Sequence, residues 1–87
     1  MTHSLEIIWD TEITNDTVHK FRNFGEDVYR EFRDELVISI DEIYSSTDRF
    51  TVKNIKPKQL KRVLSRLEKV AESHFLSDEL EINSSKE

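Results

Sequence analysis

Residues 18–40 read VHKFRNFGEDVYREFRDELVISI, and this stretch decides the fold because its hydrophobic period changes from helical to extended within it. In the first part, apolar residues and the single glycine recur at spacings of three and four, which predicts an amphipathic helix packed on a core. The last part, residues 36–40, is rich in β-branched residues and predicts a strand. The residues expected to face inward are Val18, Phe21, Gly25, Val28, Tyr29, Phe32 and Leu36 in the helix, with Leu36, Ile38 and Ile40 in the strand.

Two other segments are predicted to pair with this strand in one sheet. Residues 5–9 and 50–55 alternate between apolar and polar side chains, as half-buried strands do. A polar turn cluster precedes the second segment, so we expect 36–40 and 50–55 to form a β-hairpin with its tip at Tyr44 to Arg49. The inward residues of these two strands are expected to be Leu5, Ile7, Trp9, Phe50 and Val52.

A second helix is predicted after Pro57, because proline suits the first turn of a helix, where its missing N–H needs no partner. Leu80 and Ile82 flank a glutamate, which is a weak indication of a short closing strand. Residues 83–87 are expected to be a disordered tail. The apolar face of the second helix consists of Leu60, Val63, Leu64, Leu67, Val70, Ala71 and His74.

The expected order of elements is therefore β-α-β-β-α with a possible closing strand, in a single α+β domain over residues 1–82. This order fits the ferredoxin-like plait, a two-layer fold with an antiparallel sheet and both helices on one face. A three-stranded sheet under two helices is the alternative if the closing strand is absent. The plait hosts many unrelated functions, so function has to be sought in the surface residues.

Composition limits the class of protein. The chain has 87 residues, of which 36% are hydrophobic, and this suffices for one small core. The lack of cysteine excludes disulfides and thiolate chemistry and fits a reducing compartment. No apolar run is long enough to span a membrane, and Met1 to Ser4 does not resemble the start of a secretory signal. We therefore expect a cytoplasmic protein without a membrane partner.

No motif for catalysis or for a cofactor is found in the sequence. One glycine allows neither a phosphate-binding loop nor a nucleophile elbow. His74 has no second ligand at helical spacing on its apolar face, so packing or capping is its favoured role. We expect a non-enzymatic protein that holds neither metal nor cofactor. A cation site would require several acidic residues to converge, and nothing in the sequence fixes the distances between them. These residues are Asp10, Glu12, Asp41, Glu42 and Asp48.

Gly25 stands in the middle of the first helix's inward face, where glycine costs about 0.5–1 kcal/mol relative to alanine. The favoured explanation is a close approach of this helix to the sheet or to the second helix. The alternative is a kink or break after Phe24, or a groove in which a ligand or partner reaches the backbone.

Charge is unevenly distributed along the chain. The formal net charge is −5, yet residues 51–70 hold seven basic side chains and one acidic side chain. On the second helix, Lys58, Arg62 and Lys69 are expected nearly opposite the apolar face, with Arg66 slightly to one side. Either this strip is hydrated and attracted to the acidic helix beside it, or it binds an anionic partner.

The lack of catalytic motifs, together with a compact scaffold and segregated charge, favours a protein-binding domain that acts as an adaptor, inhibitor or regulatory subunit. The alternative is nucleic-acid binding through phosphate contacts from the same strip. The expected outer sheet face has no aromatic residue for base stacking, and its small patch of Ile8 and Val37 leaves open a homodimer through the sheet. The residues expected to contact a partner are Lys58, Arg62, Arg66 and Lys69 on the helix, with Tyr44 and Arg49 at the hairpin tip.

Overall fold

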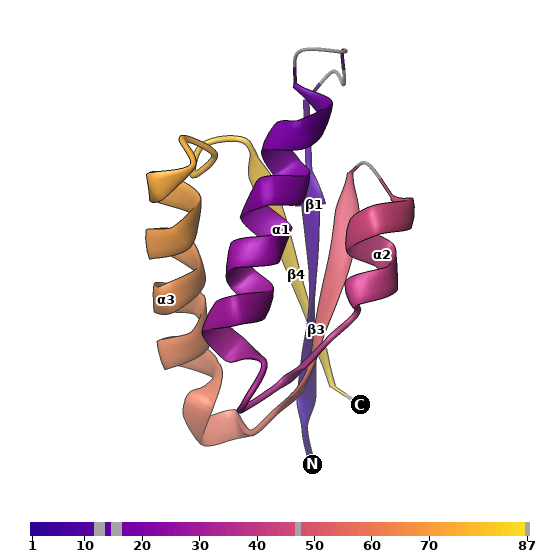
Figure 1. The fold of residues 1–87 in the computed structure, drawn as a ribbon. Helices are drawn as coiled ribbons and strands as arrows, with labels where there is room; N and C mark the ends of the chain where they lie inside the picture. Colours follow the sequence, from indigo (N-terminus) through magenta and orange to yellow (C-terminus); the bar gives the residue numbers. More distant parts are fainter. Residues whose placement is uncertain (12–13, 15–16, 47, 87) are drawn as a thin grey trace.

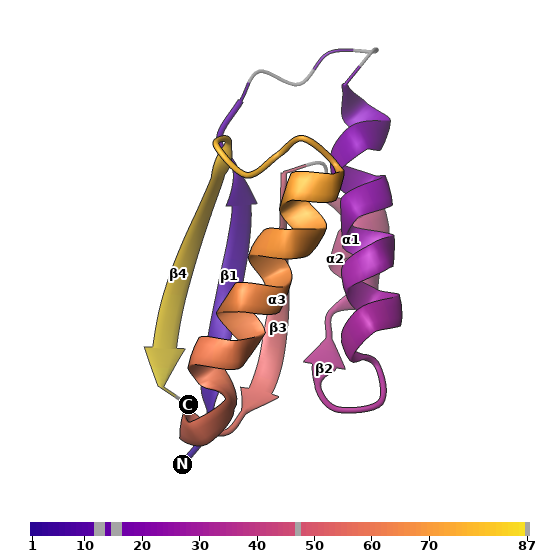
Figure 2. The ribbon, with the colours of Figure 1, turned by 90° about the vertical axis from the view of Figure 1, so that its left-hand side faces the viewer.

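A four-stranded antiparallel sheet carries three α-helices on one of its faces (Figures 1 and 2). This computed structural model describes the whole chain except residues 12–13, 15–16, 47 and 87. Over the described residues, the elements in chain order are β1 (His3–Trp9), α1 (Val18–Phe32), β2 (Val37–Ile38), α2 (Ile40–Ser45), β3 (Arg49–Ile55), the 3-10 turn η1 (Pro57–Gln59), α3 (Leu60–Ser73) and β4 (Leu80–Lys86).

The strand order across the sheet is β2-β3-β1-β4, and every neighbouring pair is antiparallel. β1 lies between β3 and β4, so its Ile7 is paired with Phe50 on one side and with Ile82 on the other. The α+β class predicted from the sequence is confirmed, with an antiparallel sheet and helices packed on it.

The segment after α1 differs from the prediction. β2 covers only Val37 and Ile38, which pair antiparallel with Lys53 and Val52 of β3, so the predicted pairing of the two segments is confirmed. The chain forms the short helix α2 between them, so the hairpin turn predicted at Tyr44 to Arg49 is wrong. Ile43 is buried and Ile40 is 37% exposed, where Ile40 was expected to face inward. The physical reason is that Leu36, Ile38 and Ile40 follow the alternation of a strand, whereas Ile40 and Ile43, three residues apart, share one face of a helix.

Two local features favour α2. Its first turn carries Asp41 and Glu42, and carboxylates are stabilised at the positive end of the helix dipole. Ser39, which precedes the helix, accepts a hydrogen bond from Thr51 N–H at 2.8 Å and donates its hydroxyl to the Thr51 carbonyl at 3.0 Å. The side chain therefore continues the pairing with β3 while the main chain turns into the helix.

The core lies between the sheet and the helices, and aromatic rings fill much of it. The rings of Trp9 and Phe21 stack with 5.6 Å between their centroids, and Phe24 lies 5.8 Å from Phe50. Phe24 is fully buried although the sequence pattern did not include it in the inward face. The side chain of Val18, which was included, is not among those described.

The glycine at position 25 is explained by the close approach of α1 to the short helix α2. A Cβ atom at position 25 would lie 3.0 Å from Cγ2 and 3.1 Å from Cγ1 of Ile43. The neighbour predicted from the sequence was the sheet or the second helix. α1 runs unbroken from Val18 to Phe32, so the alternative of a break after Phe24 does not hold.

The closing strand is present and longer than its sequence signal suggested. β4 pairs with β1 from Leu80, opposite Trp9, to Lys86, opposite His3. Asn83 to Lys86 therefore belong to the sheet, where a disordered tail was expected, and Glu87 lies outside the described residues. With β1 in the centre, both chain ends come to the same edge of the molecule (Figure 1).

Candidate functional site

The outward side of α3 is basic, as the sequence predicted. α3 buries Val63, Leu67 and Ala71 against the core, and the helical period turns the opposite side to solvent. Lys58 in η1 and Arg62 and Lys69 in α3 are exposed, and we call these three residues the basic face. Among the residues that the structure describes, no salt bridge involves any of them.

Arg66 is placed differently from the other three cations. Its Nη2 donates to Glu31 Oε1 at 2.8 Å and its Nη1 to Glu35 Oε2 at 2.9 Å, both on the α1 side. The guanidinium also lies 4.5 Å from the centre of the Phe32 ring, and the side chain is 27% exposed. Hydrogen bonding to Glu31 raises the pKa of Arg66, against the lowering effect of burial. Arg66 thus joins α3 to α1 and is occupied within the fold.

Further exposed cations lie outside the basic face. Lys53 near the end of β3, Lys56 before η1 and Lys61 in the first turn of α3 are all exposed. Lys86 ends β4, two strands away from Ile55, because His3 pairs with Ile55 on one side and with Lys86 on the other. No sequence signal could have found Lys86, because its position depends on the strand order.

Tyr44 and Arg49 do not lie at a hairpin tip. Tyr44 is in the last turn of α2, is 52% exposed, and has the Arg22 guanidinium 5.9 Å from its ring centre. Arg49 is the first residue of β3, and its guanidinium lies 3.5 Å from Asp48 and 3.8 Å from Glu6. α1 lies between α2 and α3 (Figure 1), so Tyr44 is not continuous with the basic face.

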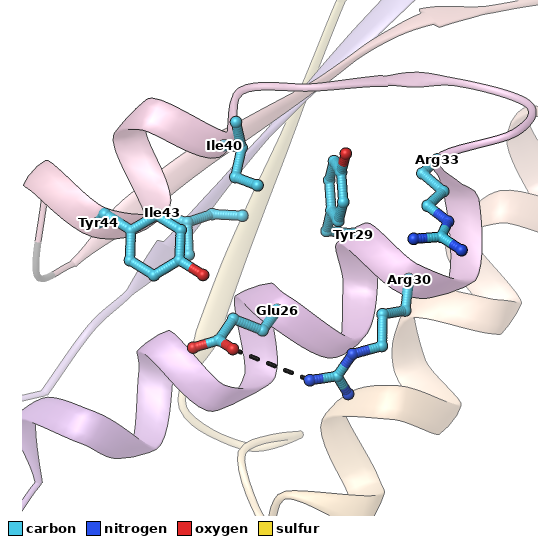
Figure 3. Close-up of a pocket in the computed structure, with 7 residues that line it drawn as sticks. All are labelled: Glu26, Tyr29, Arg30, Arg33, Ile40, Ile43 and Tyr44. Carbon is cyan, nitrogen blue, oxygen red and sulfur yellow. Dashed lines mark ion pairs between the residues drawn. The ribbon is translucent and has the colours of Figure 1, made fainter.

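α1 and α2 enclose an open pocket of about 210 Å³ (Figure 3). Arg30 on its rim forms ion pairs with Glu26 and Asp27. Arg33 is exposed and has no salt bridge within the described part of the chain. Sequence reasoning missed this α1–α2 pocket because it predicted a strand where α2 forms. The residues that line it are Glu26, Tyr29, Arg30, Arg33, Ile40, Ile43 and Tyr44.

His74 packs at the end of α3, in the role favoured from the sequence. Its Nε2 lies 2.5 Å from Asp27 Oδ2, and its ring meets the ring of Phe24 edge-on at 6.0 Å. Over the described residues, no three His, Cys, Asp or Glu side chains are grouped so that they could hold a metal ion. Glu12, one of the carboxylates considered above, lies outside those residues.

The outer face of the sheet is not covered by a described helix (Figure 2). Its side chains are at least partly exposed, and Val37 is 55% exposed. Within the described strands, this face presents no aromatic ring on which a nucleic-acid base could stack. The residues on it are Ser4, Glu6, Ile8, Val37, Arg49, Thr51, Lys53, Glu81, Asn83 and Ser85.

Comparison with protein-family models, with curated proteins and with solved structures finds no significant match to this chain. Among the helices that the structure describes, none combines the length and the apolar character needed to cross a membrane.

Proposed function

We propose that this chain is a small cytoplasmic, non-enzymatic domain that binds an acidic protein surface through the basic face, as an adaptor, inhibitor or regulatory subunit. The observation that carries the proposal is a contrast among the cations of η1 and α3. Arg66 is neutralised by two glutamates of the same chain, whereas Lys58, Arg62 and Lys69 have no salt bridge with any described residue.

The basic face is a small cost to the isolated fold. Like charges four residues apart on a helix destabilise it by a few tenths of a kcal/mol, and cations in the first turn oppose the helix dipole by about 0.3–1 kcal/mol each. An acidic partner would offset this cost, because its carboxylates would attract the cations of the basic face. Arg62 and Lys69 lie about 10 Å apart along the axis, at 1.5 Å per residue, so a single acidic patch can meet both.

The net charge favours a protein partner over a nucleic acid. A chain with a net charge of −5 is repelled at long range by a polyanion such as DNA or RNA. A limited acidic patch meets the basic face at close range, within a screening length of about 8–10 Å, where the remote acidic groups contribute little. The lack of aromatic residues on the described outer sheet face also argues against a base-stacking platform.

We also propose that the fold is a variant of the ferredoxin-like plait in which α2 is inserted between β2 and β3. The strand order and the placement of α1 and α3 on one face support this interpretation. The plait carries many unrelated functions, so the functional proposal rests on the surface of α3 and not on the fold.

Site-specific photo-crosslinking tests the functional proposal. Ser65 is exposed between Arg62 and Lys69, and a benzophenone amino acid in its place reports on whatever covers the basic face. We expect a crosslinked protein in native lysate, and we expect its loss when Arg62→Glu and Lys69→Glu are combined. The matched control is Lys53→Glu with Lys86→Glu, which changes the net charge equally at other exposed positions.

Three outcomes would reject the proposal. One is a crosslink that persists in the Arg62→Glu, Lys69→Glu variant. Another is its loss in the Lys53→Glu, Lys86→Glu control, because net charge and not the basic face would then govern binding. The third is a crosslinked species removed by nuclease, which would assign the face to nucleic acid.

A further inference from the structure

Phe75 combines two unfavourable features, a strained backbone and an exposed aromatic ring. It follows α3 with φ of 59°, in the left-handed region that non-glycine residues seldom adopt, and its side chain is 83% exposed. The Leu76 N–H donates to the Ala71 carbonyl at 2.9 Å, and the Phe75 N–H donates to the Glu72 carbonyl at 3.1 Å. This is the helix ending in which glycine usually takes the left-handed position.

Within the chain, nothing described compensates for phenylalanine at this position. Leu76, the next residue, is fully buried and provides the apolar contact that accompanies this type of helix ending. The Phe75 ring itself points into solvent, and its carbonyl accepts a hydrogen bond from Lys20 Nζ at 3.4 Å. An exposed aromatic residue at a strained position is the kind of residue that anchors a protein–protein contact.

The α1–α2 pocket has the size and lining to receive such a ring. A cavity of about 150 Å³ is large enough to hold benzene, and this pocket measures about 210 Å³. Figure 3 shows Tyr29 and Tyr44 on two sides of it with Ile40 between them, an arrangement suited to an aromatic guest. Arg33 lies on the rim as an exposed cation.

The ring and the pocket lie too far apart to meet within one chain. Phe75 follows α3, whereas α2, which supplies one wall of the pocket, lies on the other side of α1 (Figure 1). We propose that Phe75 of one copy inserts into the α1–α2 pocket of a second copy. Glu72 and Asp78, exposed on either side of Phe75 in the sequence, supply carboxylates for Arg33 of the receiving copy.

The proposed contact joins two different surfaces and leaves the basic face free. Each copy carries one aromatic ring and one pocket, so reciprocal insertion closes a two-fold dimer, and one-way insertion continues into a cyclic or open chain of copies. A single aromatic anchor gives a weak contact, because the loss of rotational and translational freedom opposes association. Self-association is therefore expected at high protein concentration and is independent of an acidic partner.

Amide NMR spectra of the 15N-labelled protein over a concentration series test the contact. We expect the amides of Ile40, Tyr44, Arg33 and Leu76 to shift with concentration up to about 1 mM. Phe75→Ala and, separately, Ile40→Arg, which fills the pocket with a cation, should each abolish the shifts. The spectra also show directly whether each variant is folded.

Mixing the two variants gives the sharpest test. The labelled Phe75→Ala protein retains its pocket, and the unlabelled Ile40→Arg protein retains its ring, so the mixture should restore the pocket shifts that neither variant shows alone. Phe75→Gly removes the ring while suiting the left-handed backbone, and it should behave as Phe75→Ala does. Val37→Ala on the outer sheet face is the control that should still self-associate.

Four results would overturn the proposal. The spectra of the wild-type protein do not change up to about 1 mM, or the protein still associates after Phe75→Ala. The mixture of the two variants fails to restore the shifts, or Val37→Ala abolishes association. The last result would assign self-association to the outer face of the sheet.

Discussion

Replacing Arg66 by alanine should destabilise the fold much more than the same change at Arg62, one turn away. Each of the ion pairs of Arg66 with Glu31 and Glu35 contributes about 0.2–1 kcal/mol, because the carboxylates are nearly half exposed. The contact of the guanidinium with the Phe32 ring contributes about 0.5–1 kcal/mol. We therefore expect Arg66→Ala to lower the free energy of unfolding by about 2 kcal/mol and the melting temperature by roughly 10 °C.

Thermal and urea unfolding of the two variants measure this difference. Arg62 is exposed and has no salt bridge with a described residue, so Arg62→Ala should change the stability by less than about 0.5 kcal/mol. In 1 M NaCl, where the screening length is about 3 Å, the gap should narrow but remain, since the contact with the Phe32 ring is less affected by salt. Equal effects of the two substitutions, or a gap that is insensitive to salt, would refute the assignment of Arg66 to the contact between α1 and α3.

Three further substitutions test the packing of the helices and the sheet. Gly25→Ala should destabilise the fold by about 1 kcal/mol in urea unfolding, because overpacking against Ile43 at 3.0 Å outweighs the gain in helix propensity. Ile43→Ala should then cost less stability in the Gly25→Ala background than in the wild-type protein. Phe75→Gly should stabilise by about 1 kcal/mol in calorimetry, since it relieves the left-handed backbone, and a loss of stability would contradict the strain. Trp9→Phe removes the 2.8 Å hydrogen bond from the indole to Glu79 and also leaves a cavity in the core, so its loss of stability should be about 1 kcal/mol larger in the wild-type background than when Glu79→Ala is already in place.

The sequence pattern predicted the long elements because each has enough residues to establish its period. α1 and α3 span four turns or nearly so, and their apolar stripes match the buried faces apart from Phe24. β1 and β3 were identified by their alternation. α2 was missed because its six residues span fewer than two helical turns, and Ile40 also continues the strand-like alternation of Leu36 and Ile38. Ile43 of α2 lies against Gly25, a contact that a local pattern does not contain.

The basic face was predicted from the sequence, whereas the pairing of Arg66 and the α1–α2 pocket were not, because these two depend on contacts between distant segments. The outward direction of Arg62 and Lys69 follows from the helical period alone. The pairing of Arg66 depends on which side of α3 faces α1, and its partners Glu31 and Glu35 are more than thirty residues away in the sequence. The α1–α2 pocket could not be foreseen without α2.

Lysine footprinting by acetylation and mass spectrometry tests the central claim most directly. The reactivity of each exposed lysine is compared between the protein in buffer and the protein in native lysate. If α3 binds its partner through the basic face, the acetylation of Lys58 and Lys69 should fall several-fold in lysate while Lys53 and Lys86 react as before. Unchanged reactivity of Lys58 and Lys69, or protection of Lys53 and Lys86 alone, would contradict the account.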